Sequence, residues 1–199
     1  MANNCYNLFD FYGNNKVKQQ VKVWKEALAN VAATKEDPYC MLAVIDVFYP
    51  NIKDKNSIDM GSKWAHEDDA SIGPDEDQIG LLSAWNPPHE LHKHMACLLF
   101  KLDKHVVVQN SFNIEDGSQG VAYATPNDEE SAYFQSTHVE LDADDFEDSD
   151  DALDAQLANL EENQIEILDY LMDDMPGTAK VIKKHKKYFS DKFDWTKYD

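Results

Sequence analysis

Two consecutive prolines, Pro87-Pro88, constrain the fold of this chain more than any other feature of its sequence. Proline has no backbone N–H to donate, so a strand cannot continue through the pair, whereas a helix can begin directly after it. The residues before the pair, 79–85 (IGLLSAW), are mostly apolar and predict a short buried strand. The residues after it, 89–102, carry apolar side chains at helical spacing. The sequence therefore predicts a strand, a sharp stop and a helix at its centre.

Four further segments are expected before this central unit. Residues 5–12 (CYNLFDFY) alternate well enough for a half-buried strand. Residues 16–33 carry apolar side chains at steps of three and four, with lysines on the other face, and predict an amphipathic helix. Residues 41–49 (MLAVIDVFY) are rich in β-branched and aromatic side chains and predict a central strand. A short strand starting at 63–65 is expected to turn back into the strand before the prolines.

The segment after the central helix is expected to form more strands. Residues 105–114 and 120–125 have strand composition, and Glu115-Asp116-Gly117 between them is typical of a hairpin turn. Residues 131–141 can add one more strand. The order β-α-β-β-β-α-β-β places helices over one face of an antiparallel sheet, so we expect an α+β domain over residues 1–141.

An acidic block separates this domain from the rest of the chain. Residues 142–151 (DADDFEDSDD) contain seven acids in ten positions, a run that repels itself and cannot pack, so we expect a linker there. Residues 152–199 are expected to be helical. A long acidic helix with a leucine stripe from Leu153 to Leu171 is followed by a break at Pro176-Gly177 and a lysine-rich helix. Their opposite charges favour a helical hairpin.

The net charge of −20 limits the partners that this chain can bind. It has 38 acidic and 18 basic residues, and every basic residue is Lys. Arginine supplies the planar fork that recognises phosphate and guanine, so its absence disfavours direct binding of nucleic acid. No secretory signal and no membrane span are predicted. Cys5, Cys40 and Cys97 are too widely spaced for a disulfide framework or a zinc site, which favours the cytoplasm, and Cys5 and Cys97 are expected in the core.

Several short motifs resemble one known family. The start MANNCYN, the segments GSKWAHEDD and LSAWNPP, and the later EDGSQGVAYA are similar to the YubB-type ferredoxin-like domain of phage and plasmid proteins. Asn4 stands where that family usually has Trp. The resemblance covers residues 1–126 and implies a ferredoxin-like fold and a mobile-element origin. It implies no catalytic residue, because the family has no established activity. The matching residues are Asn3, Cys5, Asn7, Gly61, Lys63, Trp64, Ala84, Trp85, Pro87, Pro88, Glu115, Gly117 and Gly120.

The only concentrated group of ligand-type side chains is on the predicted central helix. His89 and His92 share a helix face, but the H-E-x-x-H motif is absent because position 93 is Lys. We expect exposed helix histidines rather than a metal site. The acidic runs 67–69 and 75–77 lack the spacing of a calcium loop and are expected to form a solvated hairpin tip. The sequence therefore predicts no metal, no cofactor and no catalytic residue.

The leading functional hypothesis is that the acidic tail imitates nucleic acid. Fifteen acids lie between positions 140 and 174, a density comparable in order of magnitude to a phosphate backbone. We expect a non-enzymatic phage or mobile-element protein that binds and inhibits a basic host protein of nucleic-acid metabolism, such as a defence nuclease or a polymerase. The residues expected to bind this partner are Asp142, Asp144, Asp145, Glu147, Asp148, Asp150, Asp151, Glu161 and Glu162.

Three other interpretations stay open. In the first, the protein is a structural module whose C-terminal hairpin offers its leucine stripe to a second copy, giving a homo-oligomer. In the second, it is a small metal-dependent hydrolase or nuclease that uses residues 89–94 with the carboxylates of 67–77. In the third, the acidic runs only keep the protein in solution.

Overall fold

The strand, proline pair and helix at the centre of the chain form as predicted. Strand β3 (Gln78–Ala84) ends just before the prolines, and helix α3 (His89–Leu99) begins just after them. One N–H of the first turn of α3, that of Leu91, donates to the Met60 carbonyl over 3.2 Å. Gly61 has φ +79, and a Cβ there would lie within 2.9 Å of two backbone nitrogens of α3. The loop at 60–61 therefore fits closely against the start of the helix.

The computed structural model describes residues 3–30, 41–62, 65–67, 78–140 and 150–198. Its other strands are β1 (Asn4–Tyr12), β2 (Ala65–Glu67), β4 (Val107–Ile114), β5 (Gln119–Pro126) and β6 (Ala132–Val139). Its other helices are α1 (Asn15–Ala29), α2 (Met41–Phe48), α4 (Asp150–Asp174) and α5 (Pro176–Lys184). The start of the predicted strand at 63–65 and most of the acidic tip that follows lie outside the described residues.

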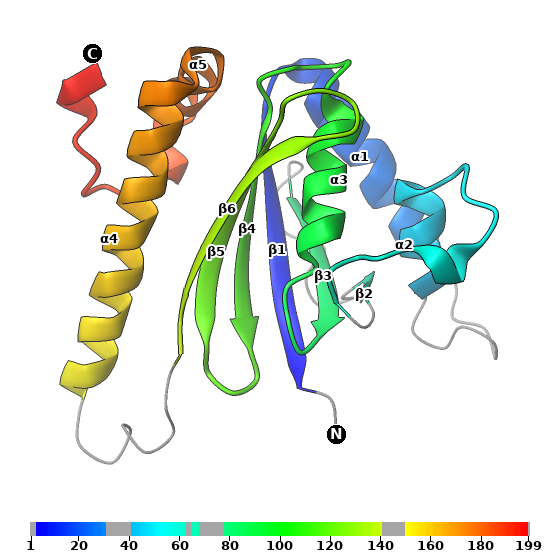
Figure 1. Ribbon diagram of the computed structural model, residues 1–199, viewed down its shortest axis with the longest axis horizontal. Helices are drawn as coiled ribbons and strands as arrows, with labels where there is room; N and C mark the ends of the chain where they lie inside the picture. Colours follow the sequence, from blue (N-terminus) through cyan, green and yellow to red (C-terminus); the bar gives the residue numbers. More distant parts are fainter. Residues whose placement is uncertain (1–2, 31–40, 63–64, 68–77, 141–149, 199) are drawn as a thin grey trace.

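The six described strands form one antiparallel sheet in the order β2-β3-β1-β4-β5-β6 (Figure 1). Strand β1 lies inside the sheet, because β3 pairs with one of its edges and β4 with the other. Strands β1 to β4 with α1 and α3 have the β-α-β-β-α-β connectivity of a ferredoxin-like fold, and β5 and β6 extend the sheet. Gly117, at φ 98, closes the predicted β4–β5 turn. The predicted α+β class and ferredoxin-like sheet are confirmed.

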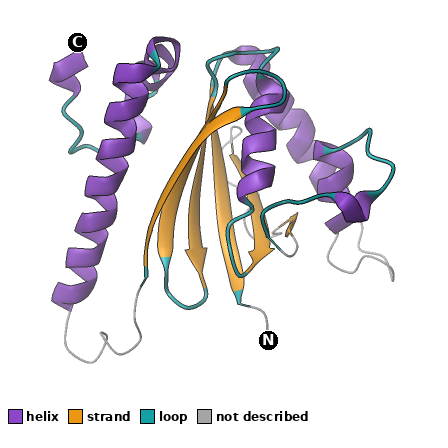
Figure 2. Cartoon of the chain, in the orientation of Figure 1, coloured by secondary structure: helices purple, strands orange, loops and turns teal. Residues whose placement is uncertain are grey.

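Helices α1, α2 and α3 cover the first face of this sheet, and Figure 2 shows the sheet between two layers of helices. The apolar sides of the three helices meet Phe9 and Phe11 of β1 and Val108 of β4 in one buried core. The predicted stripe of the first helix is confirmed, since its buried residues are Val17, Val21, Trp24 and Leu28.

The strand predicted at 41–49 is wrong, because this segment forms helix α2. Its apolar run is nearly continuous, and periodicity cannot distinguish a buried strand from a short buried helix in such a run. The ring of Phe48 packs edge-on against Trp24 of α1, with ring centres 5.0 Å apart. Its carbonyl accepts a hydrogen bond from His94 Nε2 of α3 over 2.8 Å. Packing against α1 and α3, together with a place beside β1 already taken by β3 and β4, favours the helix.

Helices α4 and α5 cover part of the second face of the sheet. Tyr12, Val107 and Tyr123 alternate with the residues of the first core and therefore point to this face. The predicted C-terminal helical hairpin forms, and it shares an apolar core with the sheet. The buried residues of this second core are Tyr12, Val107, Val121, Tyr123, Ile167, Leu168, Leu171, Met172, Ala179, Ile182, Phe189 and Phe193.

Leu168→Ala is expected to lower the free energy of unfolding by about 2–5 kcal/mol, because the substitution leaves a cavity at a fully buried contact between α4 and the sheet. The matched control is Leu157→Ala, on the same helix but 37% exposed, which should cost less than about 1 kcal/mol. Urea denaturation of both variants measures the difference. Equal losses for the two would contradict the packing of α4 on the sheet.

Candidate binding site

A cleft opens between the second face of the sheet and helix α4. Its volume is about 480 Å³, which lies in the range of small-molecule sites, roughly 300–1,000 Å³. Strands β1, β4 and β5 contribute one side of the cleft, and α4 contributes the other. Side chains that line the cleft include the apolar Leu8, Val121 and Leu160, the aromatic Tyr6, and the polar Ser111, Asn113, Gln119 and Gln164.

The cleft exists because α4 is longer than the core that it covers. The 25 residues of α4 span about 37 Å, whereas a strand of eight residues spans about 27 Å. In the C-terminal half of α4, Ile167, Leu168, Leu171 and Met172 are buried. Toward its start, Leu160 is only partly buried and Leu157 is exposed. The described part of α4 therefore covers the sheet beside Leu157 and Leu160 only in part.

Hydrogen bonds fix two of the polar side chains in the cleft. Gln164 Nε2 donates to the hydroxyl of Tyr123 over 2.6 Å. Burial raises the pKa of Tyr123, so its hydroxyl stays neutral and can accept this bond. Ser111 Oγ accepts a hydrogen bond from Gln109 Nε2 over 3.2 Å. By contrast, the ring of Tyr6 is 46% exposed at the edge of the cleft.

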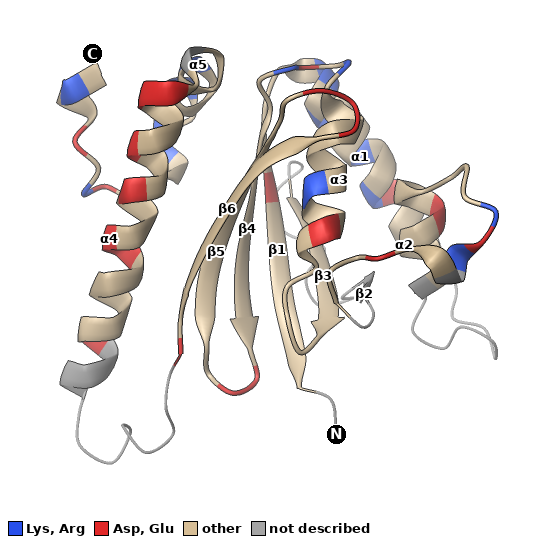
Figure 3. Ribbon diagram, viewed as in Figure 1, with Lys and Arg blue, Asp and Glu red and all other residues tan. Residues whose placement is uncertain are grey.

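All of the net charge of the chain lies in the segment that builds most of this cleft. Residues 105–179 contain 20 of the 38 acidic residues and none of the 18 lysines. The other 18 acids equal the 18 lysines in number, so the rest of the chain is formally neutral. Strands β4, β5, β6 and helix α4 belong to this segment. In Figure 3, α4 and the β4–β5 turn carry Asp and Glu and no Lys.

The nine residues predicted to bind a partner are only partly described. Asp150 and Asp151 begin α4, and Glu161 and Glu162 lie near its middle. Glu162 is exposed and forms no ion pair among the described residues. The remaining predicted residues lie outside the described part of the chain: Asp142, Asp144, Asp145, Glu147 and Asp148.

Glu161, in contrast, is paired within the molecule. Its carboxylate accepts from Lys192 Nζ over 2.5 Å and from Ser190 Oγ over 2.7 Å. The hydrogen bonds from Lys192 and Ser190 hold the pKa of the Glu161 carboxyl below its usual value. Part of the predicted partner surface is therefore already neutralised by the C-terminal segment.

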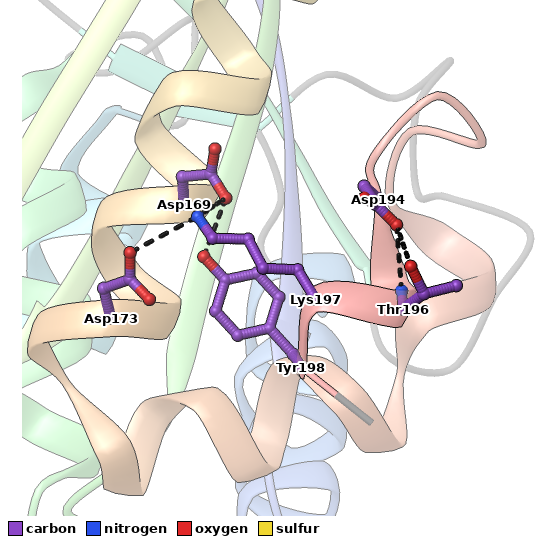
Figure 4. A network of polar contacts seen from close by, with 6 residues as sticks. All are labelled: Asp169, Asp173, Asp194, Thr196, Lys197 and Tyr198. Atoms are coloured by element: carbon purple, nitrogen blue, oxygen red, sulfur yellow. Dashed lines mark hydrogen bonds and ion pairs between the residues drawn. The ribbon is translucent and has the colours of Figure 1, made fainter.

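A second lysine of the C-terminal segment pairs with two acids that the sequence did not single out (Figure 4). Lys197 Nζ lies 3.2 Å from a carboxylate oxygen of Asp169 and 3.5 Å from one of Asp173. The Tyr198 hydroxyl also donates to Asp169 over 2.7 Å. The contacts of Lys197 with Tyr198 and Asp169 raise the pKa of its ammonium group. These contacts hold Lys197 and Tyr198 against α4.

The lysines of α5 do not supply the ion pairs that the opposite charges of the two helices suggested. Helix α5 packs beside α4 through apolar residues such as Ala179 and Ile182. In the part of the chain that the structure describes, Lys180, Lys183 and Lys184 form no ion pair with α4. The ion pairs with α4 come instead from Lys192 and Lys197, which follow α5 in the chain.

Residues of the family-like motifs meet at one end of the sheet. The backbone N–H and the Nδ2 of Asn4 donate to the carboxylate of Glu115 over 2.9 and 2.7 Å. The Trp85 N–H donates to the Asn3 carbonyl over 2.8 Å, and Trp85 has φ 68, a left-handed conformation that is rare for a bulky residue. These contacts join β1, β3 and the β4–β5 turn, which gives the motif residues a structural role.

The prediction of exposed histidines on the central helix is wrong for His92, which is fully buried. Its Nε2 donates to the Val108 carbonyl over 2.8 Å. His94 stacks on Tyr49 with ring centres 4.1 Å apart, and the half-buried His89 contacts Phe134 edge-on. The buried face of α3 is wide and includes both Leu91 and the adjacent position 92, so the ring of His92 lies between the helix and the sheet.

No group of three His, Cys, Asp or Glu side chains within the described ranges is arranged to hold a metal ion. The acidic residues 68–77, which the hydrolase hypothesis requires, lie outside those ranges. Cys5 and Cys97 are buried free thiols, as expected, and burial raises the pKa of Cys5 to about 11. These two thiols are therefore protonated near neutral pH.

Comparison of the chain with protein-family models, with curated proteins and with solved structures gives no match. Among the described helices, none combines the length and the apolar composition needed to cross a membrane.

We expect the free energy of unfolding to fall as the pH drops below about 6.5. Burial lowers the pKa of His92 from 6.5 to about 3 and also lowers the pKa of His89 and His94. Between the folded and unfolded pKa values the unfolded chain binds protons that the folded chain does not. Each such histidine therefore removes up to about 1.4 kcal/mol of stability per pH unit. Urea denaturation between about pH 7 and 5, above the range in which most carboxylates titrate, measures this loss.

His92→Gln should weaken this pH dependence, because a glutamine amide can donate to the Val108 carbonyl but does not titrate. His138→Gln, at an exposed position of β6, is the matched control for replacing a histidine by glutamine without disturbing the core. An unchanged slope in His92→Gln would show that the buried imidazole is not responsible.

Proposed function

We propose that this protein binds and blocks a basic host protein whose normal ligand is nucleic acid, through an acidic face made by α4 and the β4–β5 turn. The observation that carries the proposal is the separation of charge along the chain. Residues 105–179 hold the whole formal charge of −20 without a single lysine. A surface of one sign attracts partners of the opposite sign and accelerates their encounter.

Helix α4 supplies the most regular part of this face. It carries nine acids and no basic residue in 25 positions, which corresponds to one acid per about 4 Å of helix. One strand of DNA carries one phosphate per about 3.4 Å. A basic groove that neutralises phosphates can therefore accept carboxylates at a similar spacing.

The described ion pairs leave part of this charge available to a partner. Three acids of α4 are paired with Lys192 and Lys197. Four others form no ion pair with any described residue: Asp154, Glu162, Glu166 and Asp174. The absence of arginine argues for a protein partner rather than nucleic acid itself. The phage or plasmid origin that the motif resemblance implies agrees with an inhibitor of a host defence nuclease or polymerase.

The double substitution Asp154→Lys with Glu162→Lys is expected to weaken partner binding by about tenfold or more, because it places positive charge on the face that attracts the partner. The tagged full-length protein first captures its partner from a bacterial lysate. The captured protein is then loaded with labelled DNA, and the concentration of each variant that displaces the DNA is measured.

The matched control is Glu26→Lys with Asp46→Lys, which makes the same change in net charge on helices α1 and α2. Asp46 is exposed and pairs with Lys55 at the surface, so the fold should tolerate its loss. If the control weakens displacement as much as the α4 variant, net charge rather than this face is responsible. If the unchanged protein displaces no DNA from any captured protein, the proposed function is wrong.

Removing the internal partners of the acids should have the opposite effect. Lys192→Ala with Lys197→Ala frees three carboxylates of α4, so we expect displacement at several-fold lower protein concentration and a steeper weakening by salt. Titration at low and at high ionic strength measures both effects. The matched control is Lys22→Ala with Lys53→Ala. Lys22 is exposed on α1 and Lys53 is exposed after α2, so this variant makes the same change in charge away from α4 and should have a smaller effect. Weaker displacement by the first double variant would argue against α4 as the contact.

A further inference from the structure

The cleft beside α4 is an uncharged surface within the acidic half of the molecule. Among the described residues, no Asp, Glu, Lys or His side chain lines it, although its walls come largely from the segment that carries the whole net charge. Apolar side chains from three elements, Leu8, Val121 and Leu160, converge there. The cleft can therefore receive an apolar group that is surrounded by positive charge.

Acidic side chains lie around this opening. Leu157, one turn before Leu160 on α4, has Asp154 three positions before it, so these two residues share one helix face. The β4–β5 turn connects two strands that line the cleft, and it carries Glu115 and Asp116. A ligand that enters the cleft therefore meets carboxylates from two separate elements.

Part of the apolar surface here is exposed. Tyr6, which lines the cleft, is 46% exposed, and Leu157, one turn before the cleft residue Leu160 on α4, is 37% exposed. Exposed apolar side chains beside a cleft are typical of a protein interface. A partner that buries them gains contact area that a purely electrostatic encounter does not supply.

We propose, on the basis of the proposed function, that this cleft receives a single apolar or aromatic side chain from a short lysine- or arginine-rich segment of the partner. The apolar side chain fills the space between β4, β5 and α4, and the flanking basic residues lie against the acids of α4 and of the β4–β5 turn. Charge complementarity decides between possible occupants. An anionic ligand would be repelled, and a second copy of this chain would bring the same negative charge to the contact.

Two synthetic lysine-rich peptides that differ only at a central position, phenylalanine in one and serine in the other, test this inference. Isothermal titration of the full-length protein should give about tenfold tighter binding of the phenylalanine peptide, because only this peptide has a side chain to bury in the cleft. Equal affinities for the two peptides would overturn the inference and would leave the charge-based function standing. Absence of binding by either peptide at low salt would instead count against both.

Ser111→Trp blocks the cleft with little risk to the fold, because Ser111 is exposed on β4 and tryptophan suits a strand. This variant should bind both peptides with the affinity of the unchanged protein for the serine peptide. Ser136→Trp, an exposed serine on β6 that points to the other face of the sheet, is the matched control and should keep the tenfold difference. Should Ser111→Trp fail to fold, Asn113→Trp fills the same cleft from the next exposed position on that face. If Ser111→Trp still bound the phenylalanine peptide about tenfold more tightly than the serine peptide, the inference would be overturned.

Sedimentation of the same variants tests whether a second copy of this chain fills the cleft. We expect the unchanged protein and Ser111→Trp to have the same oligomeric state at all concentrations. A concentration-dependent dimer that Ser111→Trp abolishes would show that another copy of the chain fills the cleft, and would overturn the inference.

Discussion

Burial of the sheet on both faces is the constraint on which the rest of this structure depends. The run Val106-Val107-Val108 shows it most directly, because Val106 and Val108 belong to the core under α1, α2 and α3, whereas Val107 belongs to the core under α4 and α5. A sheet of this kind needs two layers of helices. Within the described residues, the first layer covers β1, and the second covers only part of its face. The cleft lies beside α4 on this second face.

Much of the fold could be predicted because strong local signals coincide with it. The proline pair, the Asp-Gly turn and the leucine stripe each allow one local structure at their positions. Helix α2 could not be predicted in this way, because a short apolar run carries no period that separates strand from helix. The burial of His92 was missed for a related reason, since histidine is common at surfaces and only the packing of α3 on the sheet places this ring against Val108.

The candidate site also combines features that the sequence shows directly with features that depend on how the elements pack. The acidity of the C-terminal helix could be predicted by inspection, and the absence of lysine from residues 105–179 was also present in the sequence as a simple gap in residue positions. The cleft could not be predicted, because Tyr6, Val121 and Leu160 come together only when the second helical layer lies on the sheet. Nor could the pairing of Lys192 and Lys197 with α4, since it depends on how the last residues fold back along that helix.

The gap in lysines between Lys104 and Lys180 also determines which chemistry can report on the acidic face. Trypsin, which cuts after lysine and arginine, releases residues 105–180 as one fragment that contains β4, β5, β6 and α4 together. Reagents that modify amines label the rest of the protein and leave these elements untouched, whereas carboxylate-directed cross-linkers label α4, which carries nine acids. Enzymes that acetylate or ubiquitinate lysine likewise find no acceptor on these elements, so modification of this kind would act on the protein elsewhere.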